Sequence, residues 1–325
     1  HRLAMIAAII TFCVIVLGAW VRLSHAGLGC PDWPGCYGQL TWPDAAAEIE
    51  SANQAFPERP FEANKAWKEM VHRYLAGSLM LLVFAMGWLA WRGPEKYRKF
   101  RALTTTLVLL IIFQALLGMW TVTLKLKPII VMAHLLGGLT SFSLILWLMF
   151  SSRKQPPDKP GMGVRRMREP IIVAIVVLAI QIALGGWTSA NYAALACPDI
   201  PTCGGEWWPE TNFKEGFVLW REIGVDYEGG LLDQPSRAAI HITHRIGAII
   251  TLLVLVTLSF RLLKIPRMRT GGQLLMSLVL AQFTLGILNV VLYLPLPNAV
   301  AHNAGAALLL ATLLSLLNKT STRMH

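Results

Sequence analysis

The feature that most constrains this chain is a set of eight apolar runs, each near the roughly 20 residues that a helix needs to cross a bilayer. Backbone polar groups in lipid must be paired within the protein, which restricts such runs to helices. Of 325 residues, 55% are hydrophobic and only 14% are charged. The sequence therefore predicts an all-α integral membrane protein. The runs lie at about 3–23, 70–91, 103–124, 129–150, 170–190, 238–260, 273–294 and 298–318.

The net charge of +11 comes from basic residues gathered in alternate connections. The positive-inside rule places these connections in the cytoplasm, and with eight crossings both termini lie there too. The connection at 190–237 is rich in Asp and Glu and is expected outside. Because topology accounts for the charge, no nucleic-acid partner is expected. The basic residues are Arg92, Lys96, Arg98, Lys99 and Arg101; Arg153, Lys154, Lys159, Arg165, Arg166 and Arg168; and Arg261, Lys264, Arg267 and Arg269.

Short motifs recur at nearly constant spacing along the chain. Leu17–Trp20 recurs as Leu184–Trp187, so the first run is predicted to be a retained helix rather than a cleaved signal. The recurrence predicts duplication of a four-helix unit, with halves at 1–160 and 161–325. The further matches are Cys30 with Cys197 and Cys36 with Cys203 at an offset of 167, Gln114–Gly118 with Gln282–Gly286 and His134 with His302 at 168, and His72–Arg73 with His244–Arg245 at 172.

Four histidines lie in the apolar runs, one pair in each predicted half. Because each unit has an even number of crossings, the repeats are expected to be parallel, with all four histidines near the outer ends of their helices. Two imidazoles at similar depth form a natural axial cage for a haem iron. The alternative for each is a hydrogen bond to a neighbouring helix. The predicted pairs are His72 with His134 and His244 with His302.

The other histidines have no such pairing. His25 and His325 are expected to be solvated, and His1 begins a chain without an initial methionine and carries no functional weight. His241 lies one turn outward of His244 on the same helix face, so both a pocket role and a role as substitute ligand stay open.

Two cysteine pairs, Cys30 with Cys36 and Cys197 with Cys203, lie in outer loops rich in Pro and Gly. The oxidising side of the membrane favours disulfides over free thiols. A metal clip is the rival, but no closely spaced histidine pair supports a zinc site. Cys13, inside the first run, is expected to be a small packing residue.

Glu69 precedes His72 by three residues and shares its helix face. Its side chain is therefore expected to lie over the outer side of a haem bound at His72. The alternative interpretation is that Glu69 lies in the first helical turn and only interacts favourably with the positive end of the helix dipole. The matching position in the second half is His241, so the two pockets differ where chemistry would be placed.

Three arginines near the outer boundary, Arg22, Arg73 and Arg245, are candidates to pair with haem propionates. The common alternative to a propionate partner is an arginine that only extends its side chain to the membrane–water interface. The tryptophans at the run ends are first read as an interfacial belt.

The Glu-x-x-His-Arg motif of Glu69–Arg73, the His-Arg-Ile-Gly motif of His244–Gly247, the Cys-Pro-Asp outer loops and the two half-repeats together resemble the haem A synthase family over essentially the whole chain. The resemblance implies a haem-dependent oxidoreductase of the bacterial inner membrane with its haem sites toward the periplasm. It implies oxidation of the C8 methyl of haem O to the formyl group of haem A for cytochrome oxidase.

Carried to the matching residues, the resemblance implies that His72 and His134 hold haem O as substrate, that Glu69 assists the oxidation, and that His244 and His302 ligate haem b. Implied partners are membrane lipid, haem O synthase, cytochrome oxidase assembly factors and an unidentified electron carrier. For the cysteine pairs, a structural clip is the first expectation and a thiol-based electron relay the alternative.

The alternative function is a bis-histidine cytochrome b that only transfers electrons. Electron transfer across the bilayer would require haems at two depths, whereas all four histidines are predicted to lie on one side. A transporter comes third, because the helices lack obvious Gly/Pro-broken midpoints.

Overall fold

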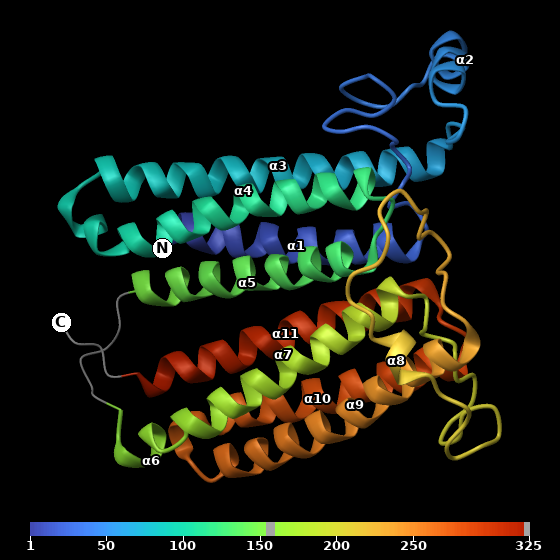
Figure 1. Ribbon diagram of the computed structural model, residues 1–325. Helices are drawn as coiled ribbons and strands as arrows, with labels where there is room; N and C mark the ends of the chain where they lie inside the picture. Colours follow the sequence, from blue (N-terminus) through green and yellow to red (C-terminus); the bar gives the residue numbers. More distant parts are fainter. Residues whose placement is uncertain (154–159, 322–325) are drawn as a thin grey trace. The chain divides into compact units, whose positions relative to one another are not determined.

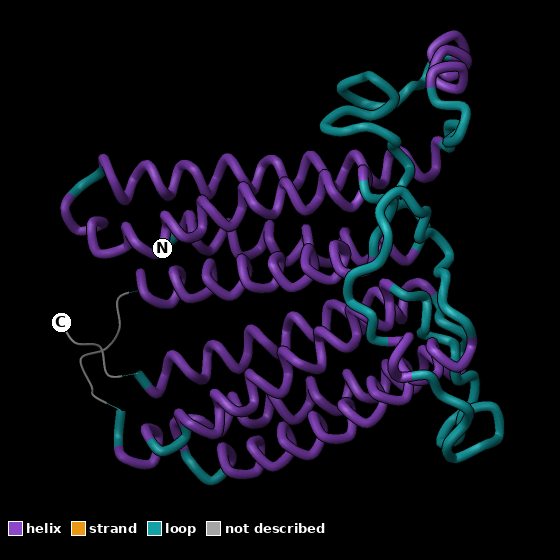
Figure 2. Tube along the Cα trace, in the orientation of Figure 1, coloured by secondary structure: helices purple, strands orange, loops and turns teal. Residues whose placement is uncertain are grey.

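A computed structural model describes residues 1–153 and 160–321, so Lys154, Lys159 and His325 lie outside the described residues. Within those ranges the chain is helical, and its only β pairing is two isolated bridges, Cys36 with Gln39 and Cys203 with Glu206 (Figures 1 and 2). Eight of the helices are long and apolar enough to cross a membrane. The prediction of an all-helical membrane protein with eight spans is confirmed.

The membrane-length helices follow the predicted apolar runs, and their bounds are α1 (Arg2–Leu23), α3 (Ala63–Arg92), α4 (Arg101–Thr123), α5 (Pro128–Ser152), α7 (Arg168–Ala190), α9 (Gln234–Leu263), α10 (Arg269–Val291) and α11 (Leu296–Thr320). The shorter elements are α2 (Ala46–Ala55), η1 (Glu95–Phe100), α6 (Met162–Arg165), α8 (Phe213–Gly216) and η2 (Pro266–Met268).

Three helices begin four or more residues before their apolar runs. α3 starts at Ala63 rather than near residue 70, α9 at Gln234 rather than near 238, and α10 at Arg269 rather than near 273. Their first turns are polar, which hides them from a hydropathy pattern. The start of α9 is set by capping, since the Asp233 side chain accepts a hydrogen bond from the Ser236 N–H and Pro235 fits the first turn.

The chain forms two compact units. One contains Ile6–Phe142 and Val218–Leu231, and the other contains His1–Met5, Ser143–Phe217 and Leu232–His325. We call these the first and second pocket units, after the histidine pair that each contains. In Figure 1, α3 and α4 run beside α1 and α5 in the first unit, and α7, α9, α10 and α11 run side by side in the second.

The segment Val218–Leu231, here called the strap, packs on helices that lie about a hundred residues or more away in the chain. Arg59 pairs with Asp226 and, at 2.5 Å, with Glu228. Tyr227 donates its N–H to the Lys125 carbonyl at 3.0 Å. The Tyr227 side chain is 3% exposed and belongs to a cluster with Leu28, Val122 and Leu126.

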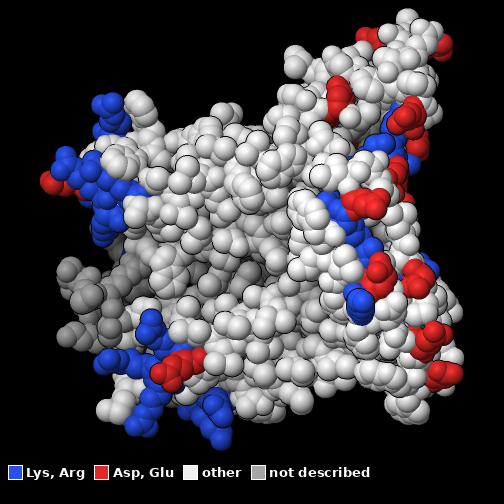
Figure 3. All heavy atoms as spheres, in the orientation of Figure 1, with Lys and Arg blue, Asp and Glu red and all other residues white. Residues whose placement is uncertain are grey.

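Charge is sorted along the helices of each unit. In Figure 3, Lys and Arg gather where α3 and α4 meet η1, whereas Asp and Glu gather among the loops at the opposite helix ends. This is the pattern from which the sequence predicted a cytoplasmic and an outer side.

The C-terminal ends of α1 and α7, and those of α4 and α10, close in the same way. After α1 and α7, His25 and Tyr192 have φ of 52° and 53°, and the next N–H bonds back five residues, as in a Schellman motif. After α4 and α10, two consecutive residues have positive φ, namely Lys125 and Leu126 and then Tyr293 and Leu294. Non-glycine residues in this region cost about 1 kcal/mol or more each, and these recur at offsets of 167 and 168.

Candidate functional site

Each unit holds one of the predicted histidine pairs. His72 on α3 and His134 on α5 lie in the first unit, whereas His244 on α9 and His302 on α11 lie in the second. Within each pair the two imidazoles are near enough to interact electrostatically. The fold thus brings together the residues that the sequence paired.

A glycine on the preceding helix packs against each imidazole. A Cβ added at that glycine would meet the ring carbon Cε1, closely enough at Gly18, Gly185 and Gly286 that the ring would have to move. The distances from the added Cβ to Cε1 are 2.9 Å for Gly18 and His72, 3.5 Å for Gly118 and His134, 3.1 Å for Gly185 and His244, and 3.2 Å for Gly286 and His302. These glycines lie in the recurring motifs, but the sequence analysis gave them no role.

The Nδ1 atoms of His72, His134 and His302 are sealed from solvent, although each of the four side chains as a whole is only half-buried. In His72, His134 and His302, Nδ1 has no hydrogen-bond partner among the described residues. In His244 it lies 3.0 Å from the Gln181 amide nitrogen. No Nε2 atom of the four is among the sealed, unpaired atoms, which leaves Nε2 as the nitrogen that faces the remaining space.

Glutamines brace three of the four histidine turns. Gln181 and Gln282 donate to the main-chain carbonyls of His244 and His302 at 3.0 and 2.9 Å. Gln114, Gln181 and Gln282 each fill the space where a Cβ would lie on a glycine of the facing helix, respectively Gly137, Gly247 and Gly305. His72 lacks such a glutamine. The position that corresponds to Gln181 is Val14, and the position that corresponds to Gly247 is Leu75.

The arrangement fits a bis-histidine haem site. Half-buried imidazoles whose Nε2 atoms have no partner among the described residues are costly in an apolar interior unless a ligand uses them. Two neighbouring imidazoles with available Nε2 atoms are a ligand set that haem iron accepts. Across the described residues, no group of three or more His, Cys, Asp or Glu side chains is arranged to hold a bare metal ion.

Both predicted disulfides are present, Cys30–Cys36 and Cys197–Cys203. In each loop the aspartate of the Cys-Pro-Asp motif accepts main-chain hydrogen bonds. Asp32 accepts from Tyr37 at 2.6 Å and from Gly38 at 2.7 Å, and Asp199 accepts from Gly204 and Gly205. The pairs therefore close capped loops.

The arginine after each first histidine holds the nearby disulfide loop. Arg73 donates to the carbonyls of Asp32, at 2.9 Å, and Gly35. Arg245 donates to three loop carbonyls at 2.8–2.9 Å, those of Thr202, Cys197 and Asp199. Arg22 lies in the last turn of α1. The propionate role of Arg22, Arg73 and Arg245 stays a prediction, and for Arg73 and Arg245 it would compete with these loop contacts.

Glu69 and His241 occupy corresponding places in these networks. Glu69 accepts from the Cys30 N–H at 2.9 Å and forms a buried ion pair with Arg73 at 2.6 Å. His241 Nδ1 lies 3.2 Å from the Cys197 N–H, and its Nε2 lies 3.3 Å from Arg245 Nε. A neutral imidazole can accept from only one of two such donors, whereas a carboxylate accepts from both.

The dipole interpretation of Glu69 is wrong. α3 begins at Ala63 and has no acid in its first turn, so Glu69 lies a full turn deeper. Its side chain is 7% exposed, and both oxygens are engaged. The sequence pattern missed this because the polar start of α3 lies outside the apolar run.

Two other sequence expectations have clear outcomes. His25 is exposed, as predicted. Cys13 is a free thiol, but it is exposed on α1 rather than packed inside. Position within an apolar run does not tell which helix face a residue occupies.

Local contacts shift the pKa values of a carboxyl and a phenol in the disulfide loops. A hydrogen bond from the Thr202 hydroxyl, with main-chain N–H groups of Gly205 and Gly204, lowers the pKa of Asp199 to about 2. Burial, with nearby acids including Glu62 and Glu69, raises the pKa of Tyr37 to about 12. Tyr37 donates its hydroxyl hydrogen to the Arg59 carbonyl at 3.1 Å.

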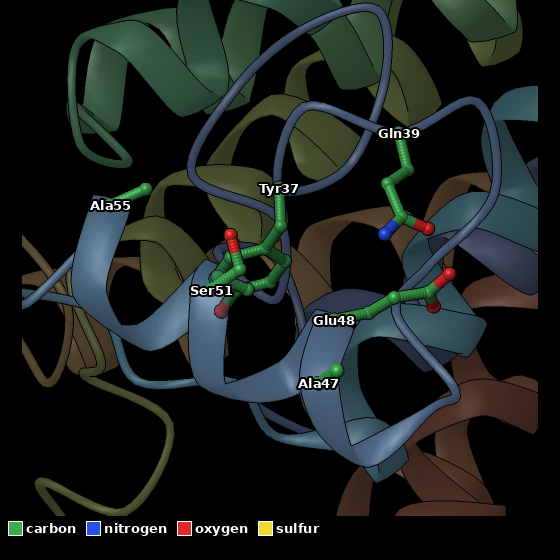
Figure 4. A pocket seen from close by; sticks show the side chains of 7 residues that line it. Tyr37, Gln39, Ala47, Glu48, Ser51 and Ala55 are labelled. Carbon is green, nitrogen blue, oxygen red and sulfur yellow. The ribbon is translucent and has the colours of Figure 1, made fainter.

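An open pocket of about 270 Å³ lies between the Cys30–Cys36 loop and α2. Figure 4 shows Tyr37 and Gln39 from the loop opposite Glu48 and Ser51 of α2. No histidine lines it, so it is separate from the imidazole pairs.

The chain is similar to known proteins over nearly its full length. A heme A synthase of Shewanella oneidensis is 46% identical over 97% of this chain and 94% of its own. Heme A synthases of Halalkalibacterium halodurans and Shouchella clausii are each 27% identical, over 92% and 90% of this chain and 90% and 87% of theirs. A family model described as cytochrome oxidase assembly protein matches residues 1–314, and the chain therefore belongs to the COX15-CtaA family.

Proposed function

We propose that this protein is a haem A synthase, which oxidises the C8 methyl of haem O to a formyl group and so provides haem A for cytochrome oxidase. The observation that carries the proposal is the pair of glycine-backed imidazole sites in a chain 46% identical to a heme A synthase. The family's description as cytochrome oxidase assembly proteins agrees with that use.

In this proposal His72 and His134 hold haem O as substrate, and His244 and His302 hold haem b. Haem b, when bound, supplies a one-electron redox centre. The division is supported by the difference beside the first histidine of each pair, where the first unit has a carboxylate at Glu69 and the second has His241.

Conversion of a methyl to a formyl group removes four electrons and four protons and adds one oxygen atom, formally that of water. The carbon passes through an alcohol and a hydrated aldehyde, which loses water. The electrons leave to an acceptor that is an unidentified electron carrier. We assign Glu69 the handling of protons or the orientation of water at this carbon, because it is the buried carboxylate one turn outward of His72.

The surrounding contacts support that role. Arg73 and the Cys30 N–H hold both oxygens of the Glu69 carboxylate. A carboxylate fixed in this way does not need to reorganise during reaction. The Glu69 side chain is only 7% exposed, so little water reaches it.

We further propose that the chain is a duplicated four-helix unit, with halves at 1–160 and 161–325 related as parallel repeats. The matched glycine contacts and matched positive-φ turns support this. Basic helix ends favour cytoplasmic termini in a bacterial inner membrane, with the haem sites and disulfides on the periplasmic side. Lipid, haem O synthase and cytochrome oxidase assembly factors are the proposed partners.

The decisive experiment is expression together with a haem O source, followed by extraction of pigments and identification of the haems by mass. Haem A in cells with the wild-type protein, and its loss in His72→Ala, would support the proposal. His25→Ala is the matched control, because it removes an exposed imidazole. Haem B alone, with haem O unchanged, would favour the electron-transferring cytochrome b instead.

A further inference from the structure

A buried ammonium group lies at the outer end of α5. Lys127 is 1% exposed, and its Nζ has no hydrogen-bond partner among the described residues. Its one described contact of note is the indole of Trp220, with Nζ 3.7 Å from the ring centroid. Both residues belong to the first pocket unit.

The contact with Trp220 does not offset the burial of the charge. A cation over a desolvated aromatic ring gains less free energy than the removal of an ammonium from water costs. Buried lysines are therefore found with an anion or a hydrogen-bond acceptor. The place of Lys127 calls for an anionic group that the described residues do not provide.

Lys127 lies close to the histidine site along the chain. It comes immediately before α5 and precedes His134 by seven residues, which is about 10 Å along the helix axis. The main-chain N–H groups of Ile130 and Val131 bond to its carbonyl, which fixes Lys127 as the residue from which α5 starts.

The strap covers this position. Trp220 comes from the strap, which the Arg59 ion pairs and buried Tyr227 hold against the first unit. Because Trp220 is 66% exposed, its ring lies at the surface and separates the Lys127 ammonium from solvent. An anion that reached Nζ would meet the charge in a poorly hydrated place, where an ion pair is strong.

The second half lacks this cation. The position matching Lys127 is Pro295, and those matching Arg22 and Lys68, two other cations near the outer helix ends, are Ser189 and Ile240. Lys68 is also buried and lies over the Trp20 ring at 5.1 Å. The added positive charge is thus particular to the first histidine pair, although the histidines themselves are duplicated.

We propose that Lys127 is a carboxylate-binding residue of the first pocket and pairs with a propionate of the haem held by His72 and His134. The inference rests on the proposed function, since it takes a carboxylate-bearing haem as the ligand of that pair. Trp220 of the strap shields the ion pair from water. Lys127 thereby distinguishes the substrate pocket from the second pocket.

The test measures binding of haem O and of its dimethyl ester, in which both carboxylates are neutral, to the purified full-length protein in detergent. First-pocket binding is the part of the absorbance change that His72→Ala abolishes. The variant is Lys127→Met, which keeps much of the side-chain volume. The matched control is Lys125→Met, which removes an exposed lysine two residues away that lies 3.7 Å from Glu58.

Wild type and Lys125→Met should bind haem O about 10- to 100-fold more tightly than the ester, as expected for a charge-assisted hydrogen bond. Lys127→Met should bind the two with affinities within about 3-fold, and Lys127→Arg should recover part of the preference. Equal preference in wild type and Lys127→Met would overturn the inference while leaving the proposed function standing. Absence of any binding that depends on His72 would overturn both.

Thermal unfolding of the haem-free protein gives a second readout. If Lys127 serves a ligand, Lys127→Met should unfold at the same or a higher temperature than wild type, since it removes a buried unpaired charge. A clear loss of stability in the haem-free protein, with unchanged preference for haem O over the ester, would identify Lys127 as a structural partner of Trp220 and overturn the inference.

Discussion

The two pocket units place their histidines on the same glycine contacts but surround them with different chemistry. In the first unit the Glu69 carboxylate lies one turn before His72 and the Lys127 ammonium lies at the start of α5, whereas the second unit has His241 and Pro295 at the matching positions. The second pair has instead an amide, that of Gln181, against His244. The comparison teaches that the histidine and glycine contacts recur in both units, whereas, among the described residues, the buried carboxylate and the unpaired ammonium occur in the first. Under the proposed function, the first pocket exchanges a substrate and the second holds a resident cofactor, whose ligands need good orientation.

The largest effect should come from removal of the second-unit ligands. His244→Ala or His302→Ala should abolish or shift the low-spin b-type spectrum of the purified protein, because two neutral imidazoles give the strong axial field. Visible spectroscopy of both variants checks this, with His25→Ala as the control. An unchanged low-spin signal in both would remove haem b from the second unit.

Substitution at Glu69 tests the chemical difference between the pockets. Glu69→Gln should retain haem binding but lower haem A formation about 100-fold, with haem O or its alcohol accumulating, if the carboxylate handles protons. His241→Gln, at the matching position, should change haem A formation much less.

Glutamine can still accept the hydrogen bond from the Cys30 N–H and has nearly the same size. The substitution therefore removes the charge and the titratable proton while it keeps the shape of the side chain. The cost in stability should be about 1–3 kcal/mol, from the weakened contact with Arg73. Haem A yield, normalised to haem-bound protein, is the measurement. Full activity of Glu69→Gln would leave the iron and porphyrin alone to account for the oxidation.

The disulfides should act alike in the two units. Loss of Cys30–Cys36 or Cys197–Cys203 by Cys→Ser should each cost about 2–3 kcal/mol in the chain-entropy model. Denaturant unfolding measures this, and mass mapping of non-reduced peptides tests the pairing itself. A large loss of activity from only the first pair, at equal stability, would favour the thiol relay over a structural clip.

Removal of the Gln181 amide should make the second pocket resemble the first. Gln181→Val places there the residue type that α1 has at Val14, and it removes the contacts with both Nδ1 and the carbonyl of His244. Haem b affinity should fall about 10-fold, as for other partners of ligand histidines. Gln114→Val is the paired measurement for His134. Unchanged haem b affinity would assign Gln181 to helix packing alone.

The smallest effect concerns the Asp199 loop. Its folded pKa of about 2 lies below the ordinary value of 3.8, so the carboxylate contributes stability above about pH 4, and that contribution is lost as the pH falls toward 2. The loop should therefore keep its hydrogen bonds at all neutral and mildly acidic pH values. Carbon-13 NMR of labelled aspartate measures the titration, with Asp199→Asn to assign the signal. A midpoint near 4 would contradict the capped loop.

The sequence was a good guide wherever one type of residue repeats at a fixed spacing. Hydropathy located eight helices, because the lipid requirement acts on whole runs of residues. The recurrence of motifs also selected the two histidine pairs that the fold brings together. It failed at Cys13 and at the start of α3, where helix face and polar end turns are decided by neighbours.

By itself, then, the sequence determined the helical membrane class, the candidate ligand pairs and the disulfide partners, because each follows from composition or from spacing along one chain. Only the tertiary structure decided that Glu69 and His241 hold corresponding disulfide loops, that glycines press against all four imidazoles, and that Lys127 is buried beneath a strap from the other half of the sequence. These are contacts between segments far apart in the chain. The energies of these contacts depend on which side chains meet and on how much water is excluded. A local sequence pattern predicts neither of these.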